Sequence, residues 1–300
     1  MNLSEMKSRF SPGLTLALAA FMIVLSGLSI WYLGRGEHIE SAFVRGSQKA
    51  QLVSRMRADL FAAAEAEKSA VMAETDEASQ DNAKRAQAAA DQVVAELKEF
   101  KALPAGNPEE TALLRRFEDA FVEYRKADEE VLALAVQNSN LKAFALSFGP
   151  ASEALGKMEL ALKPMLDAGG KGGKGGKATA TALLASKALT GAWRIQALHA
   201  PHITEKTDAR MDELEARMAA ADKEVRADLD GLGAAGGQAL AAYEEFQKDT
   251  VEVVRLSRLN TNVRSLGLSL DRKVKVLAEC IEALDALKEH LGGLGVKATR

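Results

Sequence analysis

Apolar residues recur along most of the chain at steps of three and four, the spacing that places them on one face of an α-helix. From Phe117 to Phe148 this spacing holds over four heptads, which predicts one helix with a continuous, coiled-coil-like buried seam. A second seam of the same kind runs from Leu266 to Leu291. No segment shows sustained alternation of β-branched and polar residues, so we expect an all-α fold with essentially no sheet.

The chain also repeats itself at an offset of 122 residues. Phe121–Pro150 aligns without a gap with Tyr243–Arg272, and nine of the thirty positions are identical. The identities include an Asn-x-Asn motif that begins at Asn138 in the first copy and at Asn260 in the second. Shared Ala and Leu content would not place this motif at the same seam position twice. We therefore interpret the chain as a tandem repeat of two homologous helical modules.

One stretch differs from the rest because it carries no charge. Gly13–Leu33 contains 21 uncharged residues, and at about 1.5 Å per residue such a helix covers the roughly 30 Å hydrocarbon core of a bilayer. It predicts a transmembrane helix, with residues 1–12 as a short cytoplasmic tail. A cleaved signal peptide is the alternative, because Lys7 and Arg9 precede the apolar run. However, bulky aromatic residues end the run where a cleavage site needs small ones.

Glycine content divides the remainder of the chain. Residues 168–177 hold six glycines and three lysines, a density that disfavours a helix and predicts a flexible linker. The linker separates helical-bundle module one, residues 36–167, from module two, residues 178–291, and residues 292–300 are expected to form a flexible tail. Each module divides into helices with short connections, as in antiparallel four-helix bundles. Whether the two modules stand side by side or stack end to end stays open.

This arrangement resembles a known family. A membrane span that runs into a long helix and then a four-helix bundle is similar to the four-helix-bundle sensor domain of bacterial methyl-accepting chemotaxis proteins, here with two modules in tandem. The first helices of the modules have a similar local sequence, with AEAEKSAVMAETDEAS in module one and QALHAPHITEKTDARMDELEARM in module two. No second span follows, so the sequence leaves open whether it belongs to a longer receptor or signals through a separate transmitter.

The resemblance implies a function and a location. It implies a single-pass protein of the bacterial inner membrane, anchored through Gly13–Leu33, with most of the chain in the periplasm. It further implies that the chain binds a small molecule, such as an organic or amino acid, or that it assembles as a homodimer or with a receptor partner. Binding would then displace helices in signal transduction for chemotaxis. A structural or scaffold stalk at the membrane is the alternative function.

The composition of the chain limits the partners, cofactors and reactions that we expect. The net charge of −3 offers no excess of positive charge, so we expect no nucleic-acid partner. The single cysteine, Cys280, excludes an intramolecular disulfide and a four-cysteine zinc site, and its place beside the final seam predicts a packing role. We find no glycine-rich phosphate loop and no paired Glu-x-x-His motif for a di-metal site. We therefore expect no cofactor and no enzymatic activity.

Polar positions in apolar seams and selected arginines are the candidate binding residues. Asn138 and Asn260 occupy seam positions, where an amide needs hydrogen-bond partners. Each is either a device that fixes helix register or part of a small ligand cavity. If Asn138 only fixes register, its replacement by leucine should stabilise module one. Arg55, Arg57 and Arg258 could bind a ligand carboxylate, although solvated surface charge is the default interpretation.

A weak metal candidate completes the set. His199, His202 and Glu205 follow at steps of three, which places their donor atoms near one face of a helix. Pro201 lies between the histidines and should kink that helix, and no matching acidic pair is evident elsewhere. A structural or solvent-facing role is therefore the favoured interpretation of these residues.

Overall fold

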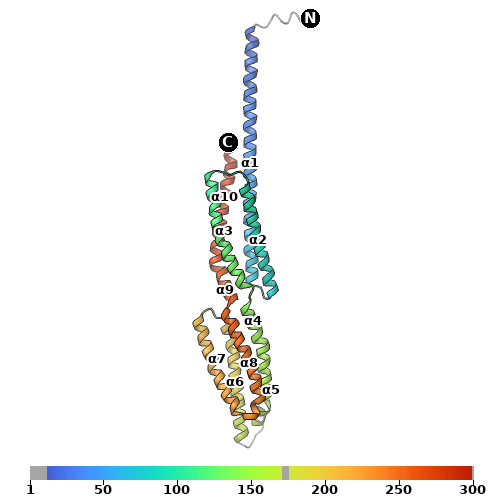
Figure 1. Cartoon of the computed structure of the whole chain (residues 1–300), viewed down its shortest axis with the longest axis vertical. Helices are drawn as coiled ribbons and strands as arrows, with labels where there is room; N and C mark the ends of the chain where they lie inside the picture. The colour runs from blue at the N-terminus through green and yellow to red at the C-terminus, as the bar shows by residue number, and fades with distance from the viewer. Residues whose placement is uncertain (1–11, 171–175, 299–300) are drawn as a thin grey trace. The chain divides into compact units, whose positions relative to one another are not determined.

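The computed structural model describes residues 12–170 and 176–298, and this part of the chain is helical without a strand (Figure 1). The prediction of an all-α fold is confirmed. In chain order the α-helices are α1 (Pro12–Val71), α2 (Asp76–Ala102), α3 (Pro108–Ala135), α4 (Ser139–Leu146), α5 (Ser152–Gly170), α6 (Gly176–Thr204), α7 (Asp208–Gly231), α8 (Gly237–Leu259), α9 (Thr261–Leu268) and α10 (Val274–Ala298). The turns η2 (Ser147–Ala151) and η4 (Ser269–Lys273) are π-helical, and η3 (Gly233–Gly236) is a 3₁₀ turn.

The helices pack into two compact units. Unit 1 comprises Met1–Phe61, Ala90–Phe121 and Ala278–Arg300, and unit 2 comprises Ala62–Ala89 and Val122–Leu277. These units do not follow the predicted modules, because each takes chain from both sides of the glycine-rich segment. The physical reason is visible in unit 2, where α5, which precedes that segment, packs against α6 and α8, which follow it.

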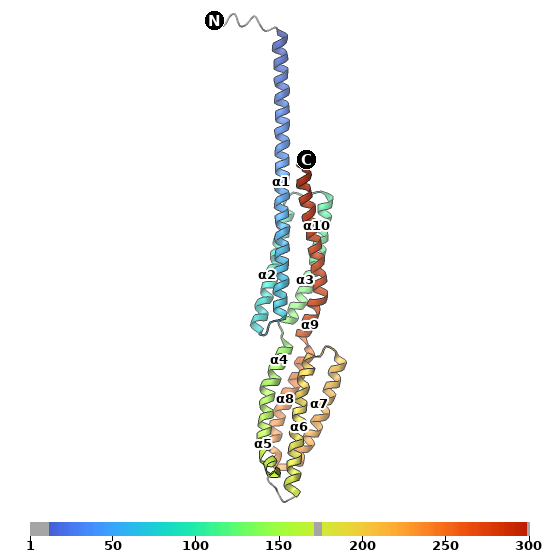
Figure 2. The same ribbon diagram turned by 180° about the vertical axis from the view of Figure 1, so that it is seen from behind.

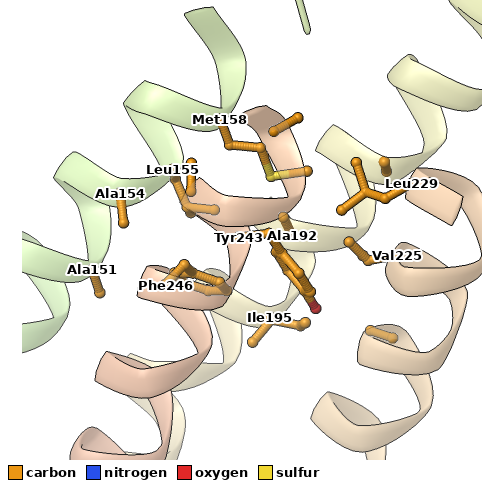
Figure 3. Packing of buried hydrophobic residues seen from close by; sticks show 14 of the residues in the cluster. Ala151, Ala154, Leu155, Met158, Ala192, Ile195, Val225, Leu229, Tyr243 and Phe246 are labelled. Carbon is orange, nitrogen blue, oxygen red and sulfur yellow. The ribbon is translucent and has the colours of Figure 1, made fainter. Parts of the chain in front are cut away.

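The largest hydrophobic core of unit 2 lies among α5, α6, α7 and α8, which run side by side in both ribbon views (Figure 2). Tyr243 and Phe246 of α8 are fully buried at its centre, between Leu155 of α5 and Ile195 of α6 (Figure 3). Burying a side chain of this size contributes roughly 1.5–3 kcal/mol. The Tyr243 hydroxyl remains satisfied because it donates a 2.8 Å hydrogen bond to Asp222.

Unit 1 packs parts of α1, α2, α3 and α10 around buried Met56, Phe100, Phe117 and Leu284. Ion pairs connect the neighbouring helices of this unit. They are Lys49–Glu110 between α1 and α3, Arg55–Glu96 between α1 and α2, Arg57–Asp285 between α1 and α10, Lys101–Glu118 between α2 and α3, and Arg116–Glu282 between α3 and α10. Most of these charges reach solvent, where a pair contributes at most about 1 kcal/mol.

The glycine-rich segments are more helical than predicted. Helix α5 extends to Gly170 and α6 begins at Gly176, while residues 171–175 in the middle of the predicted linker lie outside the described residues. Helix α10 continues to Ala298, through most of the tail predicted at 292–300. A glycine weakens a helix by about 1 kcal/mol without forbidding it, so a short glycine run can extend a helix that is already formed.

Helix α1 includes the whole of Gly13–Leu33, although most side chains of this segment and all of residues 1–11 lie outside the described residues. Where they are described, its large apolar side chains are exposed: Phe21, Met22, Ile23, Val24, Leu25 and Leu28. Within the described part of the chain, no helix combines the length and the apolar character needed to cross a membrane.

The predicted seam from Phe117 to Phe148 is correct only as far as Asn138. Asn138 has a left-handed backbone with φ of 50°, and it separates α3 from α4. A left-handed residue resets the helical phase, so a different face of the following helix meets the core. Ala143 and Ser147 are buried there, whereas Phe148 is 62% exposed.

The second copy of the repeat breaks in the same way. Asn260 has φ of 51° and separates α8 from α9, after which Ser265, Ser269 and Lys273 are buried and Leu270 is 63% exposed. The first turns of the predicted seam from Leu266 are therefore wrong, because other residues face the core there. Its last turns, in unit 1, are correct, since Leu284, Leu287 and Leu291 are buried together with Cys280.

The close approach of α6 and α7 generates a first prediction. A Cβ atom added at Gly191 would lie 2.5 Å from a methyl carbon of Val225, whereas at Gly156 of α5 it would meet nothing within 4 Å. We expect Gly191→Ala to destabilise the protein by about 1–3 kcal/mol through overpacking. Gly156→Ala should stabilise it by up to about 1 kcal/mol through helix propensity. Urea unfolding of both variants tests the contrast, and equal effects would contradict the close packing.

Candidate functional site

The two helix breaks meet in a hydrogen-bonded cluster, here called the Asn node. It consists of Asn138, Ser139 and Asn140 from the first copy and Asn260, Thr261 and Asn262 from the second. The Ser139 N–H donates to Thr261 Oγ1 at 3.1 Å, and the Thr261 N–H donates back to Ser139 Oγ at 3.0 Å. The bonds are therefore reciprocal, as expected when two copies of one motif face each other.

The neighbouring asparagines repeat this exchange. The Asn140 N–H donates to Asn262 Oδ1 at 3.1 Å, and the Asn262 N–H donates to Asn140 Oδ1 at 3.2 Å. The backbone N–H groups at the start of α4 and α9, which lack partners within their own helices, are satisfied in this way. Each helix thus supplies the capping group of the other.

The side chains of Asn138 and Asn260 extend the Asn node to further parts of unit 2. Asn138 Nδ2 donates to Asp76 Oδ1 at 2.9 Å, and its Oδ1 accepts from Asn262 Nδ2 at 3.1 Å. Asn260 Nδ2 donates to the backbone oxygen of Glu205 at 2.8 Å, and its Oδ1 accepts from Asn140 Nδ2 at 2.8 Å. Both amides therefore have protein partners at either end. A ligand-binding role for them stays a prediction.

The left-handed backbone explains why asparagine stands at these positions. A residue other than glycine with positive φ is uncommon, and asparagine is among the few that adopt it readily. At Asn138 and Asn260 the same residue type also supplies the side-chain bonds of the Asn node. The spacing of apolar residues predicted these two positions to lie within continuous helices. Asn140 and Asn262 were not among the predicted site residues, although their identity in the repeat was the available signal.

Next to the Asn node, His202 joins three helices. Its ring is fully buried, with Nδ1 at 2.7 Å from Ser257 Oγ of α8 and Nε2 at 2.9 Å from Glu215 Oε1 of α7. Arg258 Nε donates to the same Glu215 oxygen at 2.6 Å. Burial raises the pKa of Glu215, but the hydrogen bonds from Arg258 and His202 outweigh it, so the pKa lies below its usual value. Since an ionised carboxylate only accepts hydrogen bonds, Nε2 of His202 carries a proton.

The other members of the candidate metal set face different partners. His199 Nδ1 lies 3.0 Å from Ser147 Oγ, and its ring stacks on Phe246. Burial, with a smaller contribution from the neighbouring His202, lowers the pKa of His199 to about 4. Glu205 accepts from the backbone N–H groups of Lys206 and Thr207 and so stabilises the start of α7. Within the described residues, no group of three metal-ligating side chains is suitably placed for a metal ion.

The candidate arginines are all paired with carboxylates. Arg55 lies 3.4 Å from Glu96 and 3.3 Å from Glu99. Arg57 pairs with Asp285 at 3.0 Å, and its guanidinium lies over the ring of Phe61. Arg258 faces the carboxylates of Asp208, Asp212 and Glu215. Arg55 and Arg57 belong to unit 1, and Arg258 belongs to unit 2.

Glu96, the partner of Arg55, is a titratable group in the core of unit 1. It is 8% exposed, and burial together with the adjacent Asp59 raises its pKa to about 7, against the opposing charge of Arg55. Glu96 therefore titrates near neutral pH.

Two surface grooves of unit 2 are large enough for small molecules. One, of about 490 Å³, lies between α6 and α7, and the other, of about 450 Å³, lies between α5 and α8. The first has Lys187 and Arg194 facing Glu224 and Asp228, so its charges balance. Neither groove contains one of the predicted site residues.

A family model described as a four helix bundle sensory module for signal transduction matches residues 7–183. The chain belongs to this family. The match covers more than half of the sequence, and it confirms the family that the sequence pattern resembles. This sensory module therefore functions in signal transduction.

A solved structure is similar to this sensory module along most of its length. It is the sensor domain of the V. parahaemolyticus histidine kinase sensor TorS, with a TM-score of 0.54 and 12% sequence identity. The likeness covers 83% of this chain and 99% of that domain, and at such low identity it shows a shared fold alone. No curated protein matches the chain.

Because Asn138 is part of the Asn node, we expect its replacement by leucine to destabilise the protein, the opposite of the effect expected of a simple register device. We predict that Asn138→Leu destabilises the protein by about 2–4 kcal/mol, because it strains the left-handed backbone and removes both side-chain bonds. Asn138→Gly keeps the backbone conformation and should cost about 1–2 kcal/mol. Urea unfolding distinguishes the two variants. A leucine variant more stable than the wild type would show that the amide only fixes register.

Glu96 predicts a pH dependence of stability. The folded state binds the Glu96 proton more tightly than the unfolded chain, so this contribution to stability falls as pH rises from about 4.5 to about 7. Glu96→Gln should therefore match the wild type near pH 5 and exceed its free energy of unfolding by about 1–3 kcal/mol at pH 8. Glu99→Gln is the control, because Glu99 also pairs with Arg55 but is exposed. The same pH profile in both variants would refute the prediction.

Proposed function

We propose that the chain is a membrane-anchored, extracytoplasmic sensor of chemoreceptor type. In this proposal, a small ligand or a protein partner binds the helical bundle, and the resulting displacement of helices carries the signal without any catalysis. The observation that carries the proposal is the Asn node, in which two helix breaks with left-handed residues are joined by reciprocal side-chain bonds.

The Asn node is suited to relaying movement because its bonds reach several elements. Hinges are a few element-terminal residues that absorb changes in φ and ψ, and Asn138 and Asn260 occupy such positions. The bond to Asp76 reaches α2, and that from Asn140 to the backbone oxygen of Ile203 reaches α6. A shift of one of these helices would therefore strain the bonds to the others.

The membrane anchor in this proposal is Gly13–Leu33, at the start of α1. Its support is the uncharged sequence of 21 residues and the exposure of its described apolar side chains. Exposed side chains can enter lipid without first being removed from a protein core. The periplasmic side of the bacterial inner membrane is the proposed location of the remaining chain.

The proposed ligand is an organic acid or an amino acid, recognised through an arginine. Arg55 is the best placed of the three candidates, because its partner Glu99 is exposed and an exposed pair is worth at most about 1 kcal/mol. A ligand carboxylate could replace Glu99 at little cost. Arg258 is held by three carboxylates and is the weakest candidate.

A structural stalk is the second candidate. It is favoured by the bonds that the nitrogen and the oxygen of both the Asn138 and the Asn260 amide form with other protein groups. A stalk would neither bind the proposed ligands nor change the distance between its helices.

Ligand binding is tested on the full chain in detergent or nanodiscs. We expect an organic or amino acid in the screen to raise the melting temperature, because a ligand at a hundred times its Kd stabilises the folded state by about 2.7 kcal/mol. Arg55→Ala should abolish this shift, with Arg116→Ala as the control, since Arg116 is likewise paired on the surface of unit 1. No shift with any compound would contradict the small-ligand form of the proposal.

Helix displacement is tested by spin-label distances within unit 2. Labels at Met72→Cys, directly after α1, and at Val251→Cys on α8 would report on these two elements, since both positions are well exposed. Burial raises the pKa of the native Cys280 thiol to about 12, so this thiol does not compete for the label. A distance that changes on addition of the stabilising ligand supports the sensor, and an unchanged distance leaves the stalk.

The anchor is tested separately. A reporter enzyme that is active only outside the cytoplasm, fused after Arg300, should be active, and the fusion should resist carbonate extraction from membranes. Release of an uncleaved chain by carbonate would refute the anchor. Release of a shortened chain would support the signal-peptide alternative.

A further inference from the structure

Unit 2 buries a cluster of three ionisable side chains that the proposed signalling route does not use. Glu67 comes from α1, Asp128 from α3 and Lys273 from the end of η4, and each is at most 2% exposed. The Lys273 ammonium forms an ion pair with Asp128 and lies 3.5 Å from a carboxylate oxygen of Glu67. It also lies over the ring of Tyr124, 4.3 Å from the centroid.

The charges of this cluster do not balance. Two carboxylates face one ammonium group, so full ionisation would leave a net negative charge in the core of the unit. Burying an uncompensated charge costs several kcal/mol, and a carboxyl group in that position binds a proton instead. Asp128 is the carboxylate directly bonded to Lys273, whereas the nearest Glu67 oxygen lies 3.5 Å from the ammonium group. Glu67 therefore has the weaker support for a negative charge.

The surrounding groups act on the two carboxyl groups in different directions. Burial raises the pKa of Glu67 above its usual value, although Lys273 and Ser269 oppose the rise. Burial also raises the pKa of Asp128 against Lys273, and the charges of Arg125 and Glu129 on the same helix act on it in opposite directions. Helix α2 contributes alanines, Ala83 and Ala86, to the neighbouring apolar cluster.

The repeat supplies an internal comparison. At the offset of 122 residues, Asp128 corresponds to Thr250 and Lys273 to Ala151, and both of these are buried as well. The π-helical turns η2 and η4 occupy equivalent positions too. The same π-helical turn thus forms in a copy that has neither Asp nor Lys at these two positions.

We propose that Glu67, Asp128 and Lys273 form a proton-binding site that couples external pH to the position of η4, which would make the sensory module responsive to pH. With the proton bound, Lys273 pairs with Asp128 alone. Loss of the proton leaves two carboxylates competing for one ammonium group, which draws Lys273 toward Glu67. Because Lys273 ends a π-helical turn and immediately precedes α10, its movement shifts the start of that helix. Such turns are frequent at functional sites.

The proton count is tested by unfolding the full-length protein in urea between pH 5 and pH 9. One proton bound only by the folded state changes the folded-to-unfolded ratio by up to tenfold per pH unit, in the direction of lower stability at higher pH. Glu67→Gln should remove this contribution, and Glu65→Gln, an exposed carboxylate on the same helix, should leave it unchanged. Equal pH profiles for the wild type and Glu67→Gln would overturn the proposal.

Replacing Asp128 and replacing Lys273 should change the number of protons bound by the folded state in opposite directions. In Asp128→Asn one acid and one base remain, so the extra proton is lost as in Glu67→Gln. In Lys273→Met both carboxyl groups should hold protons, and the pH dependence should steepen. If either variant fails to fold, carboxyl-carbon NMR of the glutamate-labelled wild type provides the same test. A resonance that is absent from Glu67→Gln should titrate above the usual glutamate range, and its titration within that range would overturn the proposal.

The conformational coupling is measured with spin labels at Met72→Cys, directly after α1, and at Val274→Cys, at the start of α10, both in unit 2. The distance between them should change with pH in the wild-type background and stay constant in Glu67→Gln. A pH-independent distance in the wild-type background would overturn the coupling. Because no ligand is added, this result does not depend on whether the module binds a small molecule.

Discussion

The reciprocal bonding of the Asn node is the constraint on which the arrangement of unit 2 depends. A left-handed residue lies between α3 and α4 and another between α8 and α9, and each break exposes backbone N–H groups that the other copy satisfies. The new helical phase after each break then decides which side chains reach the core. Ser147 and Lys273 are buried, and Phe148 and Leu270 are exposed, because of a backbone change several residues earlier.

Periodicity predicted the helical class of the fold, and the seam residues Phe117, Tyr124, Tyr243 and Phe246 are buried as it indicated. It did not predict the phase change at Asn138 and Asn260, because a left-handed residue leaves no trace in the spacing of apolar residues before it. The repeat was a better guide, since it placed both asparagines at equivalent positions. The assignment of α5 to a unit with α6–α8 was out of reach, because it depends on packing across a glycine-rich segment.

For the candidate site, sequence reasoning identified polar residues but not their partners. His199, His202 and Glu205 have the spacing of metal ligands, yet each bonds to a different element. Glu215 and Ser257, the partners of His202, are distant in sequence and carry no motif. The buried charges of Glu67 and Lys273 were likewise hidden, since Lys273 occupies a position that an uninterrupted seam would leave in solvent. Such partners follow from tertiary contacts, which spacing along one helix does not encode.

The symmetry of the Asn node follows the sequence repeat. Every backbone bond across it is donated in both directions by equivalent residues, Ser139 with Thr261 and Asn140 with Asn262. A single copy of the motif that met itself across a true two-fold axis would offer the same donors and acceptors. The interface is thus already self-complementary at the level of one repeat. The two copies nevertheless differ beside the node, because Asp128 corresponds to Thr250 and Lys273 to Ala151.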